Sequence, residues 1–428
     1  MLPAASGNTT HHVPVQRSGS QRWLRQIVLF ALRGASNVSK FALAIYTARY
    51  LGLADLGTYG LLVGAAGIIP GAWGFGLTDW LGRHIVGLKS AEAIPLIATR
   101  LSLSLLMHVV GWPIAWIVNA ALGMPVPPLL FVLVAAVLVL EHLAIEAEDL
   151  LIPRGHIFFA NTLIFIRAGL WPPLVIVWGL LDPAARTIEH IIFGWLAALV
   201  LLWLVLALPL LFSNRRRMIG WRWQTLFSSI RPSLPFYLKD VSLVGSLYID
   251  RFLVATFLGL ELAGVYTFFW SVANVIHTLV LYGMLHNHLG QMVSTAREKN
   301  STALRRLERR LQIETVVWSL LLALAAAVAT WLLLPLIGRP LLQDYFWVFG
   351  VILLATLLRI AADGYGYMLL ALHRDRAIAV ISASGVVLSA VLNALLIPLA
   401  GLAGAACAYV ITAATLVAAR VRIRFGRA

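Results

Sequence analysis

Charged residues are scarce in this sequence of 428 residues. Asp, Glu, Lys and Arg make up only 12% of the chain, whereas the residues AVILMFWYC make up 61%, and soluble domains carry about 25% charged residues. The mean hydropathy is +0.88. These values exclude a soluble globular protein, so the lipid bilayer is the solvent in which the chain folds.

Cysteine is nearly absent too, because Cys407 is the single one and lies inside a late apolar segment. The sequence therefore excludes a disulfide framework and a thiolate metal site. It also lacks a nucleophile paired with a base, a cluster of metal ligands and a glycine loop that could cradle phosphate. We expect neither an enzyme nor a cofactor, and a proton or sodium gradient is the candidate energy source.

Continuous apolar runs predict an all-α polytopic membrane protein with about twelve transmembrane helices, since about 20 apolar residues cross the hydrocarbon core. The first six helices are expected near residues 25–48, 56–80, 94–121, 128–150, 157–180 and 190–212. The second six are expected near residues 232–258, 262–292, 313–337, 343–372, 375–398 and 401–421.

The basic residues predict the orientation of these helices. Most of the 33 Lys and Arg residues fall in one alternating set of loops and tails, to which we assign Arg100 and Arg420. The opposite set holds only Arg49, Arg186 and Arg339. Because basic loops are retained in the cytoplasm, we expect both termini there. This topology and attraction to anionic lipid heads explain the net charge of +15 without a nucleic-acid partner.

An internal repeat relates LGLADLGTY at 51–59 to LGLELAGVY at 258–266 without a gap. Each copy lies between the first and second helix of its half, which predicts two six-helix bundles in the same membrane orientation around a central cavity. The expected units are a disordered cytoplasmic tail (1–24), an N-terminal bundle (25–213), a basic cytoplasmic or interfacial linker (214–231), a C-terminal bundle (232–421) and a basic cytoplasmic tail (422–428).

Charged residues inside the apolar runs are the candidate site residues, because each costs roughly 2.5 to 3.5 kcal/mol at the bilayer centre. The first helix carries a cationic stripe on one face, formed by Arg33, Ser36, Asn37 and Lys40. The seventh helix carries a second polar stripe, formed by Lys239, Ser242, Ser246 and Asp250. Two inward cationic stripes suit an anionic substrate group such as pyrophosphate. Alternatively, Arg33 and Lys40 pair with acids such as Glu141 and only hold the bundle together.

Further charged residues lie on the fourth and tenth helices. Arg359 and Asp363 form an i, i+4 pair, a spacing that favours an intrahelical ion pair, and Arg359 is another candidate for the cationic cavity. The carboxylates of Glu141, Asp250 and Asp363 are the candidates for ion coupling. We expect a solvated helix end at three other acids, which are Glu146, Glu148 and Asp149.

Four stretches resemble the polysaccharide transporter family, the O-antigen and exopolysaccharide flippases of the multidrug/oligosaccharidyl-lipid/polysaccharide exporter superfamily. They are RYLGLADLGTYGLL (49–62), FGLTDWLGR (75–83), YIDRFLVATFLGLELAGVYTFFWSVANVI (248–276) and LNALLIPLAGLAGAACAYVIT (392–412). The similarity covers nearly the whole chain past residue 25, and its patterns of small and apolar residues specify the fold better than the cargo.

The resemblance implies a MATE-like fold in the bacterial inner membrane and export of a polyprenyl-pyrophosphate-linked oligosaccharide to the periplasmic leaflet by alternating access. It implies surface polysaccharide (O-antigen lipopolysaccharide or exopolysaccharide) synthesis, with a polymerase and assembly proteins as partners besides membrane lipids. The family's cavity cations can be carried over to Arg33, Lys40 and Lys239, whose positions match in a general way. The correspondence at Arg167 and Arg359 is weaker.

Three other functions stay open. A multidrug or organic-cation extruder of the same superfamily would need an acidic cavity, against which the excess of buried cations argues. A membrane-embedded glycosyltransferase or polymerase commonly needs a sizeable extramembrane loop, and none is predicted. A non-transporting scaffold of a polysaccharide assembly complex is compatible with the sequence.

Overall fold

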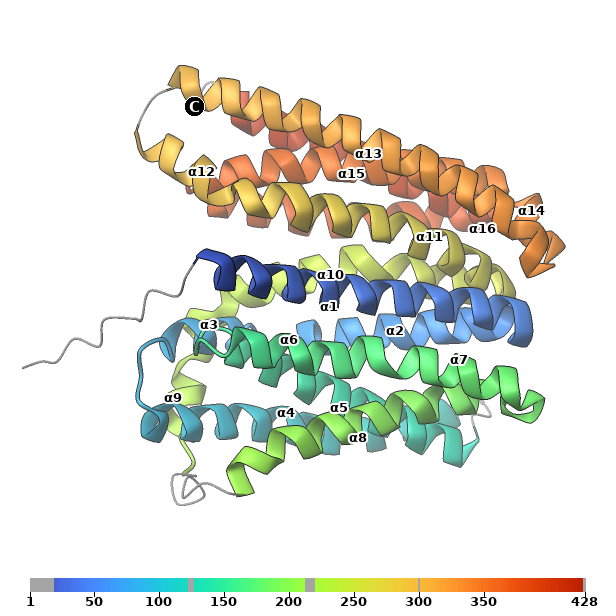
Figure 1. The fold of residues 1–428 in the computed structure, drawn as a ribbon, viewed down its shortest axis with the longest axis horizontal. Helices are drawn as coiled ribbons and strands as arrows, with labels where there is room; N and C mark the ends of the chain where they lie inside the picture. Colours follow the sequence, from blue (N-terminus) through green and yellow to red (C-terminus); the bar gives the residue numbers. More distant parts are fainter. Residues whose placement is uncertain (1–18, 122–126, 212–219, 299–300, 426–428) are drawn as a thin grey trace, which may run out of the picture.

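The computed structural model describes residues 19–121, 127–211, 220–298 and 301–425. These residues form α-helices with short π and 3-10 segments and no strand. Residues 1–18 of the expected N-terminal tail, 214–219 of the expected linker and 426–428 of the expected C-terminal tail lie outside the described residues. The helices run side by side along the long axis of the molecule (Figure 1).

The N-terminal half contains six membrane passes. They are formed by α1 (Gly19–Tyr46), α2 (Leu53–Trp73), α4 (Ser90–Ala121), α5 (Pro128–Leu151), the continuous unit of α6 (Ile157–Phe165), η2 (Ile166–Leu170) and α7 (Trp171–Leu181), and α8 (Ile188–Leu211). The short helix α3 (Leu77–His84) follows α2, and the one-turn helix α9 (Trp223–Ser228) leads into the second half.

The C-terminal half repeats this plan. Its passes are α10 (Ile230–Leu258), the continuous unit of α11 (Leu260–Val280), η5 (Leu281–Leu285) and α12 (His286–Arg297), then α13 (Ser301–Ile337), α15 (Phe346–Ala371) and the two parts of α16 (Asp375–Phe425). The short α14 (Pro340–Asp344) precedes α15. Gly401 breaks α16 with a non-helical backbone (φ 59°, ψ −137°), a conformation that glycine adopts at little cost.

The predicted all-α polytopic membrane fold is confirmed. Ten described helices are long and apolar enough to cross a membrane, and α1 together with the division of α16 brings the number of passes to the expected twelve. Some bounds differ from the prediction. Helix α1 begins at Gly19, inside the expected tail, and α13 begins twelve residues before the predicted 313, because the charged sequence that precedes each apolar run has no proline and continues the helix.

The two copies of the repeat meet each other at the centre of the molecule. Gly52 and Gly259, which are equivalent in the repeat, cap α2 and α11 with positive φ values of 130° and 85°. A Cβ at Gly57 would collide with the carbonyl of Leu260, and a Cβ at its equivalent Gly264 would collide with the carbonyl of Leu53. This reciprocal contact shows that a pseudo-twofold axis relates α2 and α11, the second helices of the two halves.

Helix α2 packs on the second half through a stripe of glycines. Beyond Gly57, a Cβ at each of four further glycines would overlap a side chain of α10 or α11; the pairs are Gly60 with Thr267, Gly64 with Phe252, Gly67 with Tyr248 and Gly71 with Val244. Their spacing of three and four residues places them on one face of the helix. Small residues allow such close backbone approach between membrane helices, so α2 closes one side of the interface along its whole length.

The contact between α1 and α11, which pseudo-symmetry relates to that between α10 and α2, is much smaller. Helix α2 packs extensively on α10, whereas α1 meets α11 over a short stretch that includes the rings of Phe41 and Phe268, 6.4 Å apart. We call the end of the molecule where α1 begins and α16 finishes the terminal end (Figure 1). At the opposite end, Arg339 donates to the carbonyls of Ala48 and Arg49 and joins the two halves. The molecule is therefore closed at the end opposite its termini.

We expect Gly57→Ala to destabilise the protein, although alanine is the better helix former. The added methyl group must push α2 away from the backbone of α11, whereas Gly350→Ala on α15 meets nothing within 4 Å and gains roughly 0.5 to 1 kcal/mol from helix propensity. Thermal unfolding in detergent should show an apparent Tm lower by at least roughly 2–4 °C for Gly57→Ala, with no decrease for Gly350→Ala. Equal Tm values for the two variants would contradict the close packing of Gly57 against the backbone of α11.

Candidate functional site

A central cleft lies between the two halves and is walled by α1, α2, α10 and α11. Its volume is about 160 Å³, room for about five water molecules at roughly 30 Å³ each. The polar side chains that line it are those of Asn37, Lys40, Tyr59, Tyr248, Arg251, Thr267, Trp270, Ser271, Asn274 and Thr278. Two of them are cations, and no carboxylate lines this cleft among the described residues.

The first cation of the cleft is Lys40 on α1. Its side chain is exposed in this structure and forms no hydrogen bond or ion pair within the described part of the chain. The ammonium lies within electrostatic reach of Arg167, Glu141 and Glu148, but those acids are paired elsewhere. The ammonium therefore adds an uncompensated positive charge to the cleft.

The second cation is Arg251 on α10, which is not among the site residues predicted from the sequence. Its guanidinium lies 3.6 Å from the ring centroid of Trp270 and 5.1 Å from that of Tyr248, and the residue is 2% exposed. These rings hold the cation without neutralising it. Buried Nε has no hydrogen-bond partner in the described residues, which leaves a donor for a ligand.

The acids that could have neutralised Lys40 are occupied by Arg167. This arginine pairs with Glu141 and, at 3.0 Å, with Glu148, and Glu141 also accepts a 2.9 Å hydrogen bond from Nε1 of Trp195. Glu141 therefore pairs with Arg167 on a neighbouring helix and not with Arg33 or Lys40. The cluster carries one cation and two acids and lies within the N-terminal half.

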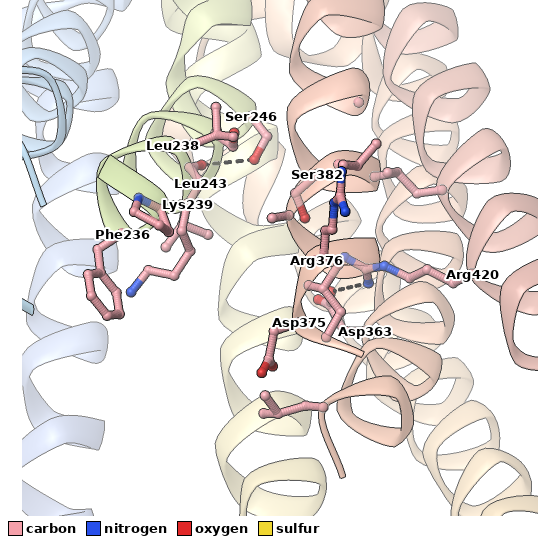
Figure 2. A pocket seen from close by; sticks show the side chains of 18 of the residues that line it. Phe236, Leu238, Lys239, Leu243, Ser246, Asp363, Asp375, Arg376, Ser382 and Arg420 are labelled. Carbon is pink, nitrogen blue, oxygen red and sulfur yellow. Dashed lines mark hydrogen bonds and ion pairs between the residues drawn. The ribbon is translucent and has the colours of Figure 1, made fainter. Parts of the chain in front are cut away.

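A larger cavity of about 1030 Å³ lies between α10 and the α15–α16 pair (Figure 2). Its walls are mostly apolar, with leucine, valine, isoleucine, alanine, proline and phenylalanine side chains from these helices. The charged residues among its lining are Arg83, Lys239, Arg359, Arg376 and Arg420, with the two acids Asp363 and Asp375. It combines the volume of a ligand pocket with an excess of positive charge.

The charges of this C-terminal cavity are partly paired. Asp363 pairs with Nε2 of His277 and with Arg420, at 2.9 Å each. Its ion-pair partners therefore come from other helices, and the expected pair with Arg359 on the same helix is not formed. Arg359 instead lies within electrostatic reach of Tyr409. Lys239 pairs with Asp79 of α3, across the two halves, and lies 3.2 Å from Asp240.

The remaining predicted site residues lie in different places. Asn37 lines the central cleft beside Lys40. Nε of Arg33 donates to Oδ1 of Asn161 on α6 at 2.8 Å, and Arg33 is not among the lining residues of either cavity. Asp250 is 7% exposed and accepts from the hydroxyl of Tyr266 at 2.7 Å. The structure thus divides the predicted cationic set between two cavities and the α1–α6 contact.

Three sequence-based assignments need correction. Arg100 and Arg420, which the sequence places with the loops, lie inside helices and are buried, and each pairs with an acid of a neighbouring helix. Glu146 and Glu148 are each 2% exposed, so the expected solvated helix end is wrong for these two acids. Asp149 is exposed, as expected. The signal that could have located the two buried acids is the presence of Arg100, His108 and Arg167 inside apolar runs, because such residues need polar partners.

Comparison with known proteins agrees with this architecture. No model of a protein family matches the chain, and no curated protein matches it in sequence. Among solved structures, it is similar to the inward-facing conformation of a multidrug resistance MATE family transporter of the MOP superfamily, at 16% identity and a TM-score of 0.69 over 91% of this chain and 94% of that chain. For the outward-facing conformation of such a transporter, the identity is 16% and the TM-score 0.57, over 94% of this chain and 95% of that chain.

A third similar structure is a MOP superfamily transporter from Pyrococcus furiosus, described as having a binding pocket of reverse polarity that suggests a different function. It is 14% identical, with a TM-score of 0.55, and the match covers 94% of both chains. The chain is a multi-pass membrane protein with the fold of the MATE transporters of the MOP superfamily.

Proposed function

We propose that this protein is a flippase that moves a polyprenyl-pyrophosphate-linked oligosaccharide from the cytoplasmic to the periplasmic leaflet by alternating access. In this proposal the protein lies in a bacterial inner membrane with both termini in the cytoplasm and serves surface polysaccharide synthesis. The fold supports a transporter in which two bundles rock about a central cleft. The terminal end is then the cytoplasmic, open end.

The observation that carries the proposal is the charge of the central cleft. Lys40 and Arg251 line it without a carboxylate, so an anionic group gains two charge-assisted contacts there. An organic cation would meet repulsion from both side chains. The cleft, at about 160 Å³, is sized for a compact anionic group, and pyrophosphate between the lipid and the sugar is such a group.

The C-terminal cavity supports a lipid-linked substrate. Its long apolar walls on α10 and α16 suit a polyprenyl chain. The wall residues Leu238, Leu243 and Val380 are 46%, 52% and 56% exposed. This apolar surface is available for van der Waals contact with an isoprenoid chain.

The alternative from the same fold is a multidrug extruder. Such an extruder is expected to have a cleft that attracts cations. The reverse polarity described for the Pyrococcus furiosus transporter, which suggests a different function, is an example of how pocket charge differs within one fold. The cationic cleft of this chain favours the lipid-linked anion over the drug. The cell experiment below separates the two.

We expect Lys40→Glu to abolish flipping because it places an acid where the pyrophosphate binds. In cells that lack the protein and any redundant flippase, lipid-linked oligosaccharide should accumulate in the cytoplasmic leaflet. Wild type and Lys40→Arg should restore its export, and Lys40→Glu should reduce the rate at least about tenfold, the effect of about 1.4 kcal/mol.

The matched control is Lys89→Glu, which makes the same change of net charge at an exposed site on the α3–α4 connection. It should export normally. A normal leaflet distribution in the cells without the protein would end the flippase proposal, and transport of an organic cation that improves with Lys40→Glu would favour the extruder.

We also expect Ser382→Trp to impair flipping by filling the C-terminal cavity that Ser382 lines. The indole occupies the space of the polyprenyl chain, so binding of the full lipid-linked substrate to the purified protein should weaken about tenfold or more. Binding of inorganic pyrophosphate should not change. Ser384→Trp, two residues further on at an exposed position of α16, is the control, and equal effects of the two variants would show that the cavity does not hold the lipid.

A further inference from the structure

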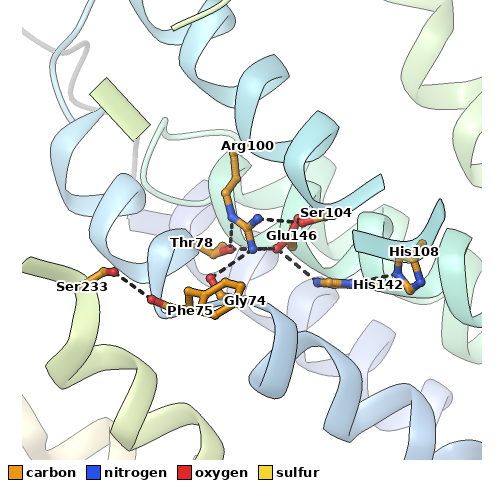
Figure 3. A network of polar contacts seen from close by, with 9 residues as sticks. All are labelled: Gly74, Phe75, Thr78, Arg100, Ser104, His108, His142, Glu146 and Ser233. Atoms are coloured by element: carbon orange, nitrogen blue, oxygen red, sulfur yellow. Dashed lines mark hydrogen bonds and ion pairs between the residues drawn. The ribbon is translucent and has the colours of Figure 1, made fainter. Parts of the chain in front are cut away.

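A chain of buried polar side chains connects α4 and α5 inside the N-terminal half (Figure 3). Nε1 of Trp112 donates to Nδ1 of His108 at 3.1 Å, Nε2 of His108 lies 3.0 Å from Nδ1 of His142, and Nε2 of His142 lies 3.2 Å from Oε1 of Glu146. Arg100 pairs with Glu146 at the end of the chain. His108, His142 and Arg100 are at most 1% exposed, and Glu146 is 2% exposed.

The donors in this chain fix the positions of its protons. Indole nitrogen only donates, so Nδ1 of His108 is an acceptor and its proton is on Nε2. That proton is donated to Nδ1 of His142, whose own proton is therefore on Nε2 and is donated to Glu146. Both imidazoles are neutral in this arrangement, and the single negative charge is on Glu146, opposite Arg100.

Glu146 already accepts four hydrogen bonds. Its Oε1 accepts from Arg100, from Thr78 at 3.2 Å and from His142, and its Oε2 accepts from Ser104 at 2.7 Å. The three donors to Oε1 exceed its two lone pairs, so a proton on Oε1 must displace one of them. Oε2 accepts a single hydrogen bond and keeps a lone pair for a proton. A proton on Nδ1 of His142 would instead oppose the proton on Nε2 of His108, which also breaks a hydrogen bond.

The same network holds the junction between α2 and α3. Arg100 donates to the carbonyl of Gly74 at 3.2 Å and to the hydroxyl of Thr78 at 3.3 Å. We call residues 74–76 the elbow. Within it, Phe75 has a φ of 51°, which is a strained value for a residue with a side chain.

The elbow is also the place where the N-terminal half contacts α10 near the terminal end. The hydroxyl of Ser233 donates to the carbonyl of Phe75 at 2.8 Å, and the rings of Phe75 and Tyr237 stack 5.6 Å apart. A Cβ at Gly76 would overlap the backbone of Tyr237. The elbow is thus held by hydrogen bonds from Arg100 on one side and by contacts with α10 of the opposite half on the other.

We infer that His108, His142 and Glu146 form a proton-binding site. Its protonation state controls whether Arg100 holds the elbow in place. The inference rests on the proposed transport function and names the proton as the ion that drives the rocking of the two halves. When a proton neutralises Glu146, Arg100 becomes a buried charge without a counterion, an arrangement that costs several kcal/mol. Arg100 then leaves Gly74, and the strained elbow is free to change its contact with α10.

The surroundings of the site add few other charges. Arg100 is on α4, and Asp149, one turn beyond Glu146 on α5, interacts with Glu148, Arg167, Glu146 and Asp79. On α3, Asp79 pairs with Lys239 of α10, which also contacts Asp240. These acids and their partners lie toward the terminal end of the network, whereas the two imidazoles lie away from it.

The test is the distance between the two halves as a function of pH. Spin labels at Val86→Cys and Gln291→Cys, both exposed near the terminal end, are introduced in the full chain after Cys407→Ser removes the exposed native thiol. The distance distribution is measured in lipid nanodiscs at about pH 5 and about pH 8, the range in which histidine sites titrate. We expect a shift between two distance populations in the otherwise native protein.

Variants locate the shift. His108→Gln and His142→Gln should remove it, because glutamine keeps a polar side chain but binds no proton, while His190→Gln on α8 should retain it. Glu146→Gln should show the low-pH distribution at both values. Absence of a shift in the native protein, or an unchanged shift in both His108→Gln and His142→Gln, overturns the inference. A shift that follows these variants in a protein that flips no lipid-linked oligosaccharide in cells would keep the proton site and reject the flippase.

Discussion

The contact between α2 and α11 at Gly57 and Gly264 is the constraint on which the rest of the structure depends. Each glycine lies against a backbone carbonyl of the other helix, and a side chain at either position would separate the two halves. Because the contact is reciprocal, it places the pseudo-twofold axis between α2 and α11. In the proposed transport cycle, the two halves rock about this contact.

The glycine contact of α2 also determines which helices supply the charged side chains of the cleft. Helix α2 brings no charged side chain to the cleft, since its inner face is a stripe of glycines, so the two cations of the cleft come from α1 and α10. Lys40 and Arg251 have no ion-pair partner among the described residues, whereas the acids Glu146, Glu141 and Glu148 of the N-terminal half are paired with Arg100 and Arg167. In the proposed function, these two cations meet the anionic group of the substrate.

Much of the fold follows from the sequence because the bilayer imposes long apolar helices and the repeat imposes two equal halves. No sequence pattern predicts the π segments in the fifth and eighth passes. The same holds for the break at Gly401, which separates two helices without a loop. Among site residues, Asn37 and Lys40 could be placed in the cleft from helical periodicity. Arg251 could not, because its neutral partners are rings from α10 and α11.

The buried network of Arg100 and Glu146 shows the other limit of sequence reasoning. Both residues lie near helix ends in the sequence, where charged residues are usually solvated, and only the approach of the α2–α3 elbow covers them. Periodicity places a residue on a face of its own helix, but it does not say which helix or elbow covers that face. For the same reason, Arg33 joins α6 instead of lining either cavity.

The most direct test of the central claim, that the cleft passes a lipid-linked anion, is transport by the purified protein in liposomes. A fluorescent oligosaccharide linked to polyprenyl pyrophosphate is placed in both leaflets, and a membrane-impermeant quencher is added outside. The proposed function predicts that, with the protein present, dye from the inner leaflet reaches the quencher. Protection of the inner-leaflet dye equal to that in protein-free liposomes, with protein that transports an organic cation under the same conditions, would contradict it.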